Sequence, residues 1–419
     1  MKELFRKIVK GDVQLWATIL TLFIVSGIVM FSAISSSAHR NTDYLAPFWG
    51  HIRHLGFGLF VMLVVHQFTY RNIRWLLYLI PLLSLVMLIV APFMGNDVNG
   101  AVRSIKVMGF EIQSIELTKL AIVFVFAEIL GLHNNHANKP MSWKTFGYIT
   151  GILAVFCGLV FTQNISTMVM IFGLAVLMMY IGNVPLKYIG TLCGSTLAIG
   201  IIAIGTLLLI SNYSDTKLPG RMGTAVKRIE RFINPEDKDP NAPIVINDEN
   251  RQIINSKIAI ANGIRFVGPG NSVQRDYLSL AFSDFVYAII IEEYTIAGGI
   301  FIILLYIIIL ARAGKIARRC AANETSESLF VIGFSILIVM QAFINMAVSC
   351  ELFPVTGQTL PLISRGGMSI LITCFGFGLI LGISAQNEER MALEQQQAAE
   401  AAATEEQETP TENAATPIQ

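Results

Sequence analysis

One carboxylate stands at the point where a long polar segment gives way to an apolar one. Asp284 lies between Phe282 and Phe285, directly before the apolar run FVYAIII. Partial desolvation would raise the pKa of a carboxyl group in this position, so that it could accept a proton near neutral pH. The competing interpretation is a helix N-cap, a common use of aspartate where a helix begins. On the local residues alone, the cap is favoured.

Two further carboxylates follow within the apolar run. A charge at that depth of the membrane is costly and usually functional or paired. We therefore expect at least one of Glu292 and Glu293 to face the protein interior. Eight residues separate Asp284 from Glu292, which corresponds to about 12 Å of helix rise. The two carboxylates are therefore not expected to act on the same atom.

A second polar cluster lies between Asn99 and Lys119. Glu116 and Lys119 are three residues apart, so they share one helix face, where they form either a structural ion pair or part of a site. Arg103 precedes them and could bind a phosphate through two parallel hydrogen bonds, or reach the lipid headgroups as an interfacial anchor.

A third cluster reads ELFPVTGQTLPLISRGGMSI. Its prolines and glycines predict a rigid, non-helical connection. Irregular backbone at membrane level survives only against protein or a wet cavity, so this loop is expected to help wall a cavity.

The polar segment before Asp284 has structure of its own. Apolar residues recur near helical spacing in 249–266, which predicts an amphipathic helix, either on the membrane surface or packed on the spans. The turn GPGNSVQR follows, and a phosphate-cradling use of Gly268 and Gly270 is conceivable. His133 and His136 lack further metal-ligand residues nearby, so no metal site is predicted.

The composition places these clusters in a membrane protein. Of 419 residues, 54% are hydrophobic and 14% charged, against about a quarter charged in soluble domains. The net charge of +1 gives no reason to expect a nucleic-acid partner. Apolar runs of spanning length predict an all-α polytopic protein with about ten transmembrane helices. They lie near 15–33, 53–69, 75–94, 117–132, 146–162, 166–182, 188–211, 285–311, 329–350 and 366–385.

Basic residues set the orientation. With the N-terminus inside, the cytoplasmic segments carry fourteen Lys and Arg residues and the short outer loops carry five, which predicts cytoplasmic N- and C-termini. A large extracytoplasmic loop, about 211–284, then lies between spans 7 and 8. We expect a membrane domain over 1–386 and a disordered cytoplasmic tail over 387–419, helical at most at its start, because this segment is rich in Glu, Gln, Ala and Thr.

Together, these clusters resemble the SEDS family of bacterial cell-wall synthases, which includes the RodA and FtsW proteins. The resemblance covers roughly residues 10–386, and GPGNSVQR is closest to FtsW. Departures occur at Ser114-Ile115, at Asn164 and Ser166 in the loosely matched pattern QPDxGT, and at Arg365, where a tyrosine is usual. The matching positions are Arg103, Gln113, Glu116 and Lys119 in the pattern GARRW…QPSExxK; Gln252, Ser256, Ala259 and Ile260 in the pattern Q…SxxAI; Asp284 and Phe285; and PVTGQTLPLISRGG, which contains Ser364.

The resemblance implies an inverting peptidoglycan glycosyltransferase of the cytoplasmic membrane that polymerises lipid II on its outer face. The similarity to FtsW favours septal synthesis in cell division. It places the family's essential aspartate at Asp284, as the base. It implies that Arg103, Glu116 and Lys119 bind the substrate, together with Gln252, Ser256 and Ser364. The implied partners are a class B penicillin-binding protein and other divisome proteins. No cofactor is required by the sequence, although Mg²⁺ or Mn²⁺ could assist the diphosphate.

Three alternatives remain open on the sequence. A flippase would use Glu116, Lys119, Glu292 and Glu293 along a transport path, although transporter sites usually lie at the bilayer midplane. A scaffold would recruit partners through the loop and the tail. An elongation-type, RodA-like polymerase would share the chemistry and differ in cellular role.

Overall fold

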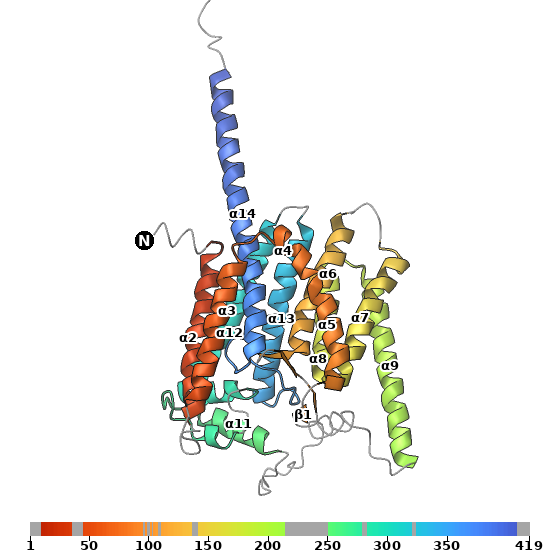
Figure 1. The fold of residues 1–419 in the computed structure, drawn as a ribbon, viewed down its shortest axis with the longest axis vertical. Coiled ribbons are helices and arrows are strands. Elements are labelled where there is room, and N and C mark those ends of the chain that lie inside the picture. Colours follow the sequence, from red (N-terminus) through yellow and green to blue (C-terminus); the bar gives the residue numbers. More distant parts are fainter. Residues whose placement is uncertain are drawn as a thin grey trace, which may run out of the picture.

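The computed structural model describes residues 10–35, 45–94, 97–98, 101–102, 104–107, 110–135, 141–213, 250–278, 283–320 and 324–408. Within these ranges the chain is a bundle of long helices, with two short β-hairpins before α6 (Figure 1). The predicted all-α class is confirmed. The helices are α2 (Val13–Ser35), α3 (Ala46–Val65), α4 (Tyr70–Leu77), α5 (Leu79–Met94), α6 (Ser114–Asn135), α7 (Trp143–Gln163), α8 (Ile165–Ile181), α9 (Leu186–Tyr213), α11 (Arg251–Asn262), α12 (Val286–Arg319), α13 (Thr325–Ser349) and α14 (Gly367–Glu408). The strands are β1 (Asp97–Val98), β2 (Ala101–Val102), β3 (Ser104–Val107) and β4 (Phe110–Gln113).

The protein is a multi-pass membrane protein. Among the described residues, seven helices are long and apolar enough to cross a bilayer: α2, α3, the α4–α5 pair, α7, α12, α13 and α14. Two of the remaining predicted spans, α8 and the Leu186–Ile202 part of α9, are apolar but shorter. The third, α6, carries Glu116, Lys119 and Glu128 along its length. The predicted number of ten spans is therefore not confirmed by length and composition alone.

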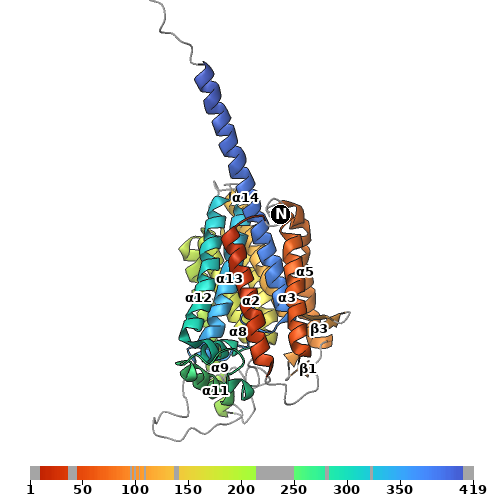
Figure 2. The same ribbon diagram turned by 90° about the vertical axis from the view of Figure 1, so that its left-hand side faces the viewer.

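The two ends of the bundle differ. We call the end that carries α11 the loop end, and the end from which α14 projects the tail end (Figures 1 and 2). Helix α13 and the membrane part of α14 are the most enclosed, whereas α9 stands at the side of the bundle (Figure 1). Where the sequence predicts disorder from Asn387 onward, the structure continues α14 as helix to Glu408.

Helix α12 is interrupted near the loop end. Thr295 has φ 66° and ψ 178°, so the backbone leaves the helical conformation there. Left-handed φ is rare and strained for a β-branched residue. The break separates a short helical segment, Val286–Tyr294, from the longer part of α12. The apolar run 285–311 is therefore divided between two helical segments, and most of the short one is buried.

Candidate functional site around Asp284

Asp284 lies just outside helix α12. The N-cap residue of α12 is Phe285, with φ −115° and ψ 18°, so the prediction that Asp284 itself caps the helix is wrong. The Asp284 side chain is half-buried, and the Ser283 hydroxyl donates a hydrogen bond to its Oδ1 over 3.0 Å. The carboxylate thus sits where the polar segment enters the bundle, as the sequence predicts.

The main chain on either side of this carboxylate is held by buried side chains. Asn345 Nδ2 of α13 donates to the Asp284 carbonyl over 3.0 Å. Ser364 Oγ donates to the Ser283 carbonyl over 2.7 Å and accepts from the Leu360 N–H over 2.9 Å. Ser364, predicted to bind substrate, is almost fully buried and ties the connection between α13 and α14 to this segment.

That connection, residues 353–366, is non-helical and enclosed by protein. Leu362 has a left-handed φ of 65° although its side chain is buried, which is a strained conformation. Side chains from α2, α12 and α13 hold four of its main-chain carbonyls. The bonds are Asn345 Nδ2 to Gln358 O (2.7 Å), Gln341 Nε2 to Thr359 O (2.9 Å), Tyr306 OH to Pro361 O (2.5 Å) and Ser26 Oγ to Ile363 O (3.2 Å). The predicted non-helical connection is confirmed, and it packs against protein; its rigidity and its role in walling a cavity stay predictions.

Glu116 and Lys119 form the predicted ion pair at the loop end of α6. Lys119 Nζ lies 2.7 Å from Glu116 Oε1 and 2.8 Å from Gln341 Oε1. Both charged side chains are largely buried, with 12% of Glu116 and 3% of Lys119 exposed. Because Gln341 also binds Thr359, the pair is joined through α13 to the same loop that Ser364 anchors.

Helix α13 therefore carries a polar stripe that sequence analysis missed. Gln341, Asn345 and Ser349 recur every four residues, which places them on one helix face. The stripe contacts Lys119, the Asp284 carbonyl and, at its end, α11: Ser256 Oγ donates to the Ser349 carbonyl over 2.8 Å. Polar residues at this spacing inside the apolar run 329–350 were the available signal.

Helix α11 packs on the spans through a polar face. Asn255, Ser256 and Ala259 are buried, whereas Ile258 is exposed. Of the two interpretations of this amphipathic segment, packing on the spans matches these contacts. Ser256, predicted to bind substrate, is fully buried between α11 and α13, and Gln252 is half-buried on the same helix.

Glu292 and Glu293 are both buried, which confirms that they face the interior. They accept hydrogen bonds from the turn 268–274. Glu293 Oε1 lies 3.1 Å from the Gly270 N–H, and Glu292 Oε1 lies 3.3 Å from the Val273 N–H. The Gly268 N–H bonds the Glu293 carbonyl over 3.2 Å. The idea that this turn cradles a phosphate is therefore wrong, because its N–H groups bind the protein's own acceptors.

One predicted site residue and one neighbour of Asp284 are not part of the described chain. Arg103 lies outside the described residues, and so does Phe282. In the part of the chain that is described, no three His, Cys, Asp or Glu side chains lie close enough together to hold a metal ion.

A family profile described as cell cycle proteins, covering FtsW, RodA and SpoVE, matches residues 13–389. The chain belongs to this family. A protein of Alcanivorax borkumensis named probable peptidoglycan glycosyltransferase FtsW is 31% identical, over 89% of this chain and 92% of its own. The FtsW of Saccharophagus degradans, named likewise, is also 31% identical, over 90% and 92%.

Solved structures share the fold. The rod shape determining protein RodA of Thermus thermophilus superposes with a TM-score of 0.60 at 20% identity, covering 90% of this chain and 97% of its own. A chain from a peptidoglycan synthase complex that coordinates polymerization and crosslinking gives 0.65 at 21% identity, covering 90% and 98%. At 20–21% sequence identity, this similarity shows that the chain shares the fold of these proteins.

Proposed function

We propose that the protein is a peptidoglycan glycosyltransferase that polymerises lipid II on the outer face of the cytoplasmic membrane. The observation that carries the proposal is the placement of Asp284: a half-buried carboxylate on a non-helical segment whose main chain is fixed by Asn345 and Ser364. A fixed backbone with a partly accessible carboxylate suits a general base. The names of the FtsW relatives support the same activity.

The chemistry needs one base. The leaving group is a lipid diphosphate, which departs without protonation by an acid. Asp284 takes the proton from the acceptor sugar's hydroxyl as that oxygen attacks the anomeric carbon, the glycosidic bond forms with inversion, and the bond to the diphosphate breaks. The carboxyl proton is then released to water. A glycosidase, in contrast, needs two carboxyl groups.

Cations would stabilise the diphosphate. In the described structure we propose Lys119 as one such cation; Glu116 and Gln341 orient its ammonium group. Arg103 is proposed as a second cation from the sequence. Ser256 and Ser364 hold the surrounding segments through their hydrogen bonds to the main chain. Substrate binding by Gln252, Ser256 and Ser364 remains proposed from the sequence. The described residues offer no dedicated set of ligands for Mg²⁺ or Mn²⁺, so a divalent cation would have to depend on the oxygens of the diphosphate itself.

We further propose septal synthesis, with both termini cytoplasmic. Support comes from the FtsW names of the relatives and from the basic residues at the N-terminus and after residue 311. A class B penicillin-binding protein is the expected partner, because a related chain occurs in a peptidoglycan synthase complex. Depletion should then give filamentous cells; rounded cells would indicate elongation instead.

The deciding experiment supplies labelled lipid II to the purified protein, with and without a class B penicillin-binding protein. Glycan strands on a gel are the expected product. Vesicles that contain the protein report in parallel whether labelled lipid II crosses the bilayer. Transport without any polymerisation would reject the proposed activity and favour the flippase.

A further inference from the structure

Helix α12 begins later than its sequence favours. Aspartate is one of the strongest N-cap residues, whereas phenylalanine has no side-chain oxygen to bind the free N–H groups of a first turn. Yet Phe285 holds the N-cap position, and the Ala288 N–H bonds the Phe285 carbonyl over 3.1 Å. An interaction outside α12 must therefore favour the later start.

Asn345 provides that interaction. Its amide nitrogen has two N–H donors, and both reach main-chain carbonyls: Asp284 O at 3.0 Å and Gln358 O at 2.7 Å. The Asp284 carbonyl is the group that would accept the first helical bond if α12 started one residue earlier. Bonded to Asn345, it stays outside the helix.

The orientation of this amide follows from the same contacts. Turning it over would place Oδ1 against two carbonyl oxygens, which repel it. In the observed orientation Oδ1 is buried and has no hydrogen-bond partner among the described residues, and Asn345 is 1% exposed. A buried acceptor left unpaired lowers stability, and such groups in native proteins call for a functional explanation.

We propose that Asn345 is a positioning residue for Asp284. It fixes the start of α12 one residue after Asp284 and ties that segment to the loop 353–366, which holds the carboxylate at a constant place and angle. The inference rests on the proposed function for its catalytic consequence. The structural claim, that Asn345 fixes the residue at which α12 begins, can be measured separately.

The kinetic test compares Asn345→Ala and Asn345→Ser with the wild type in full-length protein. Asn345→Ala should lower kcat for lipid II polymerisation at least tenfold with KM within twofold. Serine keeps one hydroxyl donor and should recover part of the loss. The matched control is Ser335→Ala, because Ser335 is buried on the same helix and its hydroxyl donates to the Val331 carbonyl one turn back. This variant should stay within twofold of wild type.

Hydrogen–deuterium exchange gives the second readout. In Asn345→Ala, a peptide that spans 283–290 should exchange at least tenfold faster, with α14 peptides unchanged. The proposal would be overturned if Asn345→Ala left both exchange and turnover unaltered. It would also be overturned if Asn345→Ala and Ser335→Ala both exchanged faster throughout the protein, because the effect would then be a general loss of packing. If the wild type makes no polymer, the proposed function fails, and exchange in 283–290 still decides whether Asn345 fixes the helix start.

Discussion

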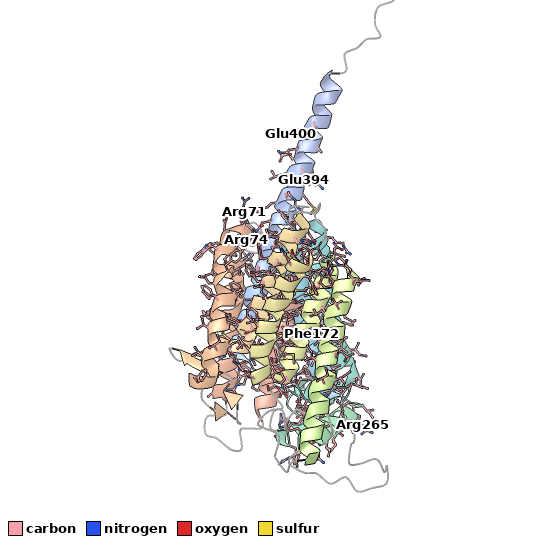
Figure 3. All side chains as sticks on the ribbon, turned by 90° about the vertical axis from the view of Figure 1, so that its right-hand side faces the viewer. Arg71, Arg74, Phe172, Arg265, Glu394 and Glu400 are labelled. Carbon is pink, nitrogen blue, oxygen red and sulfur yellow. The ribbon has the colours of Figure 1, made fainter. Side chains whose placement is uncertain are left out.

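Both ends of the bundle bury charged and polar groups, but they use their donors differently. At the tail end, donors converge on carboxylates. Glu128 accepts from Tyr70 OH (3.1 Å), from Tyr78 OH (3.0 Å) and from the Arg74 guanidinium, and Arg74 appears at this end, opposite Arg265, in Figure 3. Asp12 is bound in the same way by the Arg312 guanidinium, with Nε 3.0 Å from each carboxylate oxygen.

At the loop end, Glu116, Glu292 and Glu293 also accept hydrogen bonds, but the donors next to Asp284 bind the main chain. Asn345 and Ser364 donate to the carbonyls of Asp284 and Ser283, and Gln341 donates to the carbonyl of Thr359. The Asp284 side chain itself is half-buried. Donors on carboxylates hold helices together, whereas donors on carbonyls hold a non-helical segment in place. Under the proposed function, this difference assigns the positioning of the reactive carboxylate to the loop end.

The sharpest test replaces the cation in one ion pair at each end. Lys119→Met and Arg74→Met each leave a buried glutamate unpaired, so each should lower the free energy of unfolding by about 3 kcal/mol. Turnover per folded molecule should fall about 100-fold in Lys119→Met only, through loss of a charge that stabilises the transition state. Unfolding in detergent and lipid II polymerisation measure the two effects. Equal turnover in Lys119→Met and Arg74→Met would contradict the claim that the two ends of the bundle have different roles.

A smaller effect is expected at Ser364. Ser364→Ala leaves the Ser283 carbonyl and the Leu360 N–H unpaired, so stability should fall by about 1–3 kcal/mol. Because Ser283 adjoins Asp284, we expect turnover to fall several-fold beyond any loss of folded protein. Ser335→Ala is again the control. The account is contradicted if Ser364→Ala loses stability and retains full turnover per folded molecule.

The smallest effect should follow from an exposed ion pair at the loop end. Lys257 of α11 lies 2.6 Å from Glu351, with side chains 58% and 37% exposed. Exposed pairs contribute about 0–1 kcal/mol. Lys257→Ala should therefore leave polymerisation within twofold and barely move the unfolding transition. A large loss of turnover would show that surface contacts of α11, and not its buried face, control the site.

Local sequence was sufficient for some of these features. Glu116 and Lys119 are three residues apart, which alone places them together on a helix. The prolines and glycines of the loop 353–366 alone predict a non-helical connection. Asp284 was located because a change from polar to apolar residues marks the boundary of a buried segment.

Other features depend on contacts between distant segments. Gln341 and Asn345 acquire their roles from Lys119 and Asp284, which only the fold brings near. The N-cap prediction failed because Asn345 binds the Asp284 carbonyl, a tertiary contact that outweighs local preference. The break at Thr295 could not be predicted, because no proline marks it within the apolar run.

The most direct measurement is polymerisation of lipid II by Asp284→Asn. Asp276→Asn serves as the control, because Asp276 is exposed and lies in the turn before the site. The account predicts at least about a 100-fold loss of polymerisation in Asp284→Asn, the scale of a lost general base, with an unchanged melting temperature. Asp276→Asn should polymerise normally. Wild-type activity in Asp284→Asn would contradict the central claim.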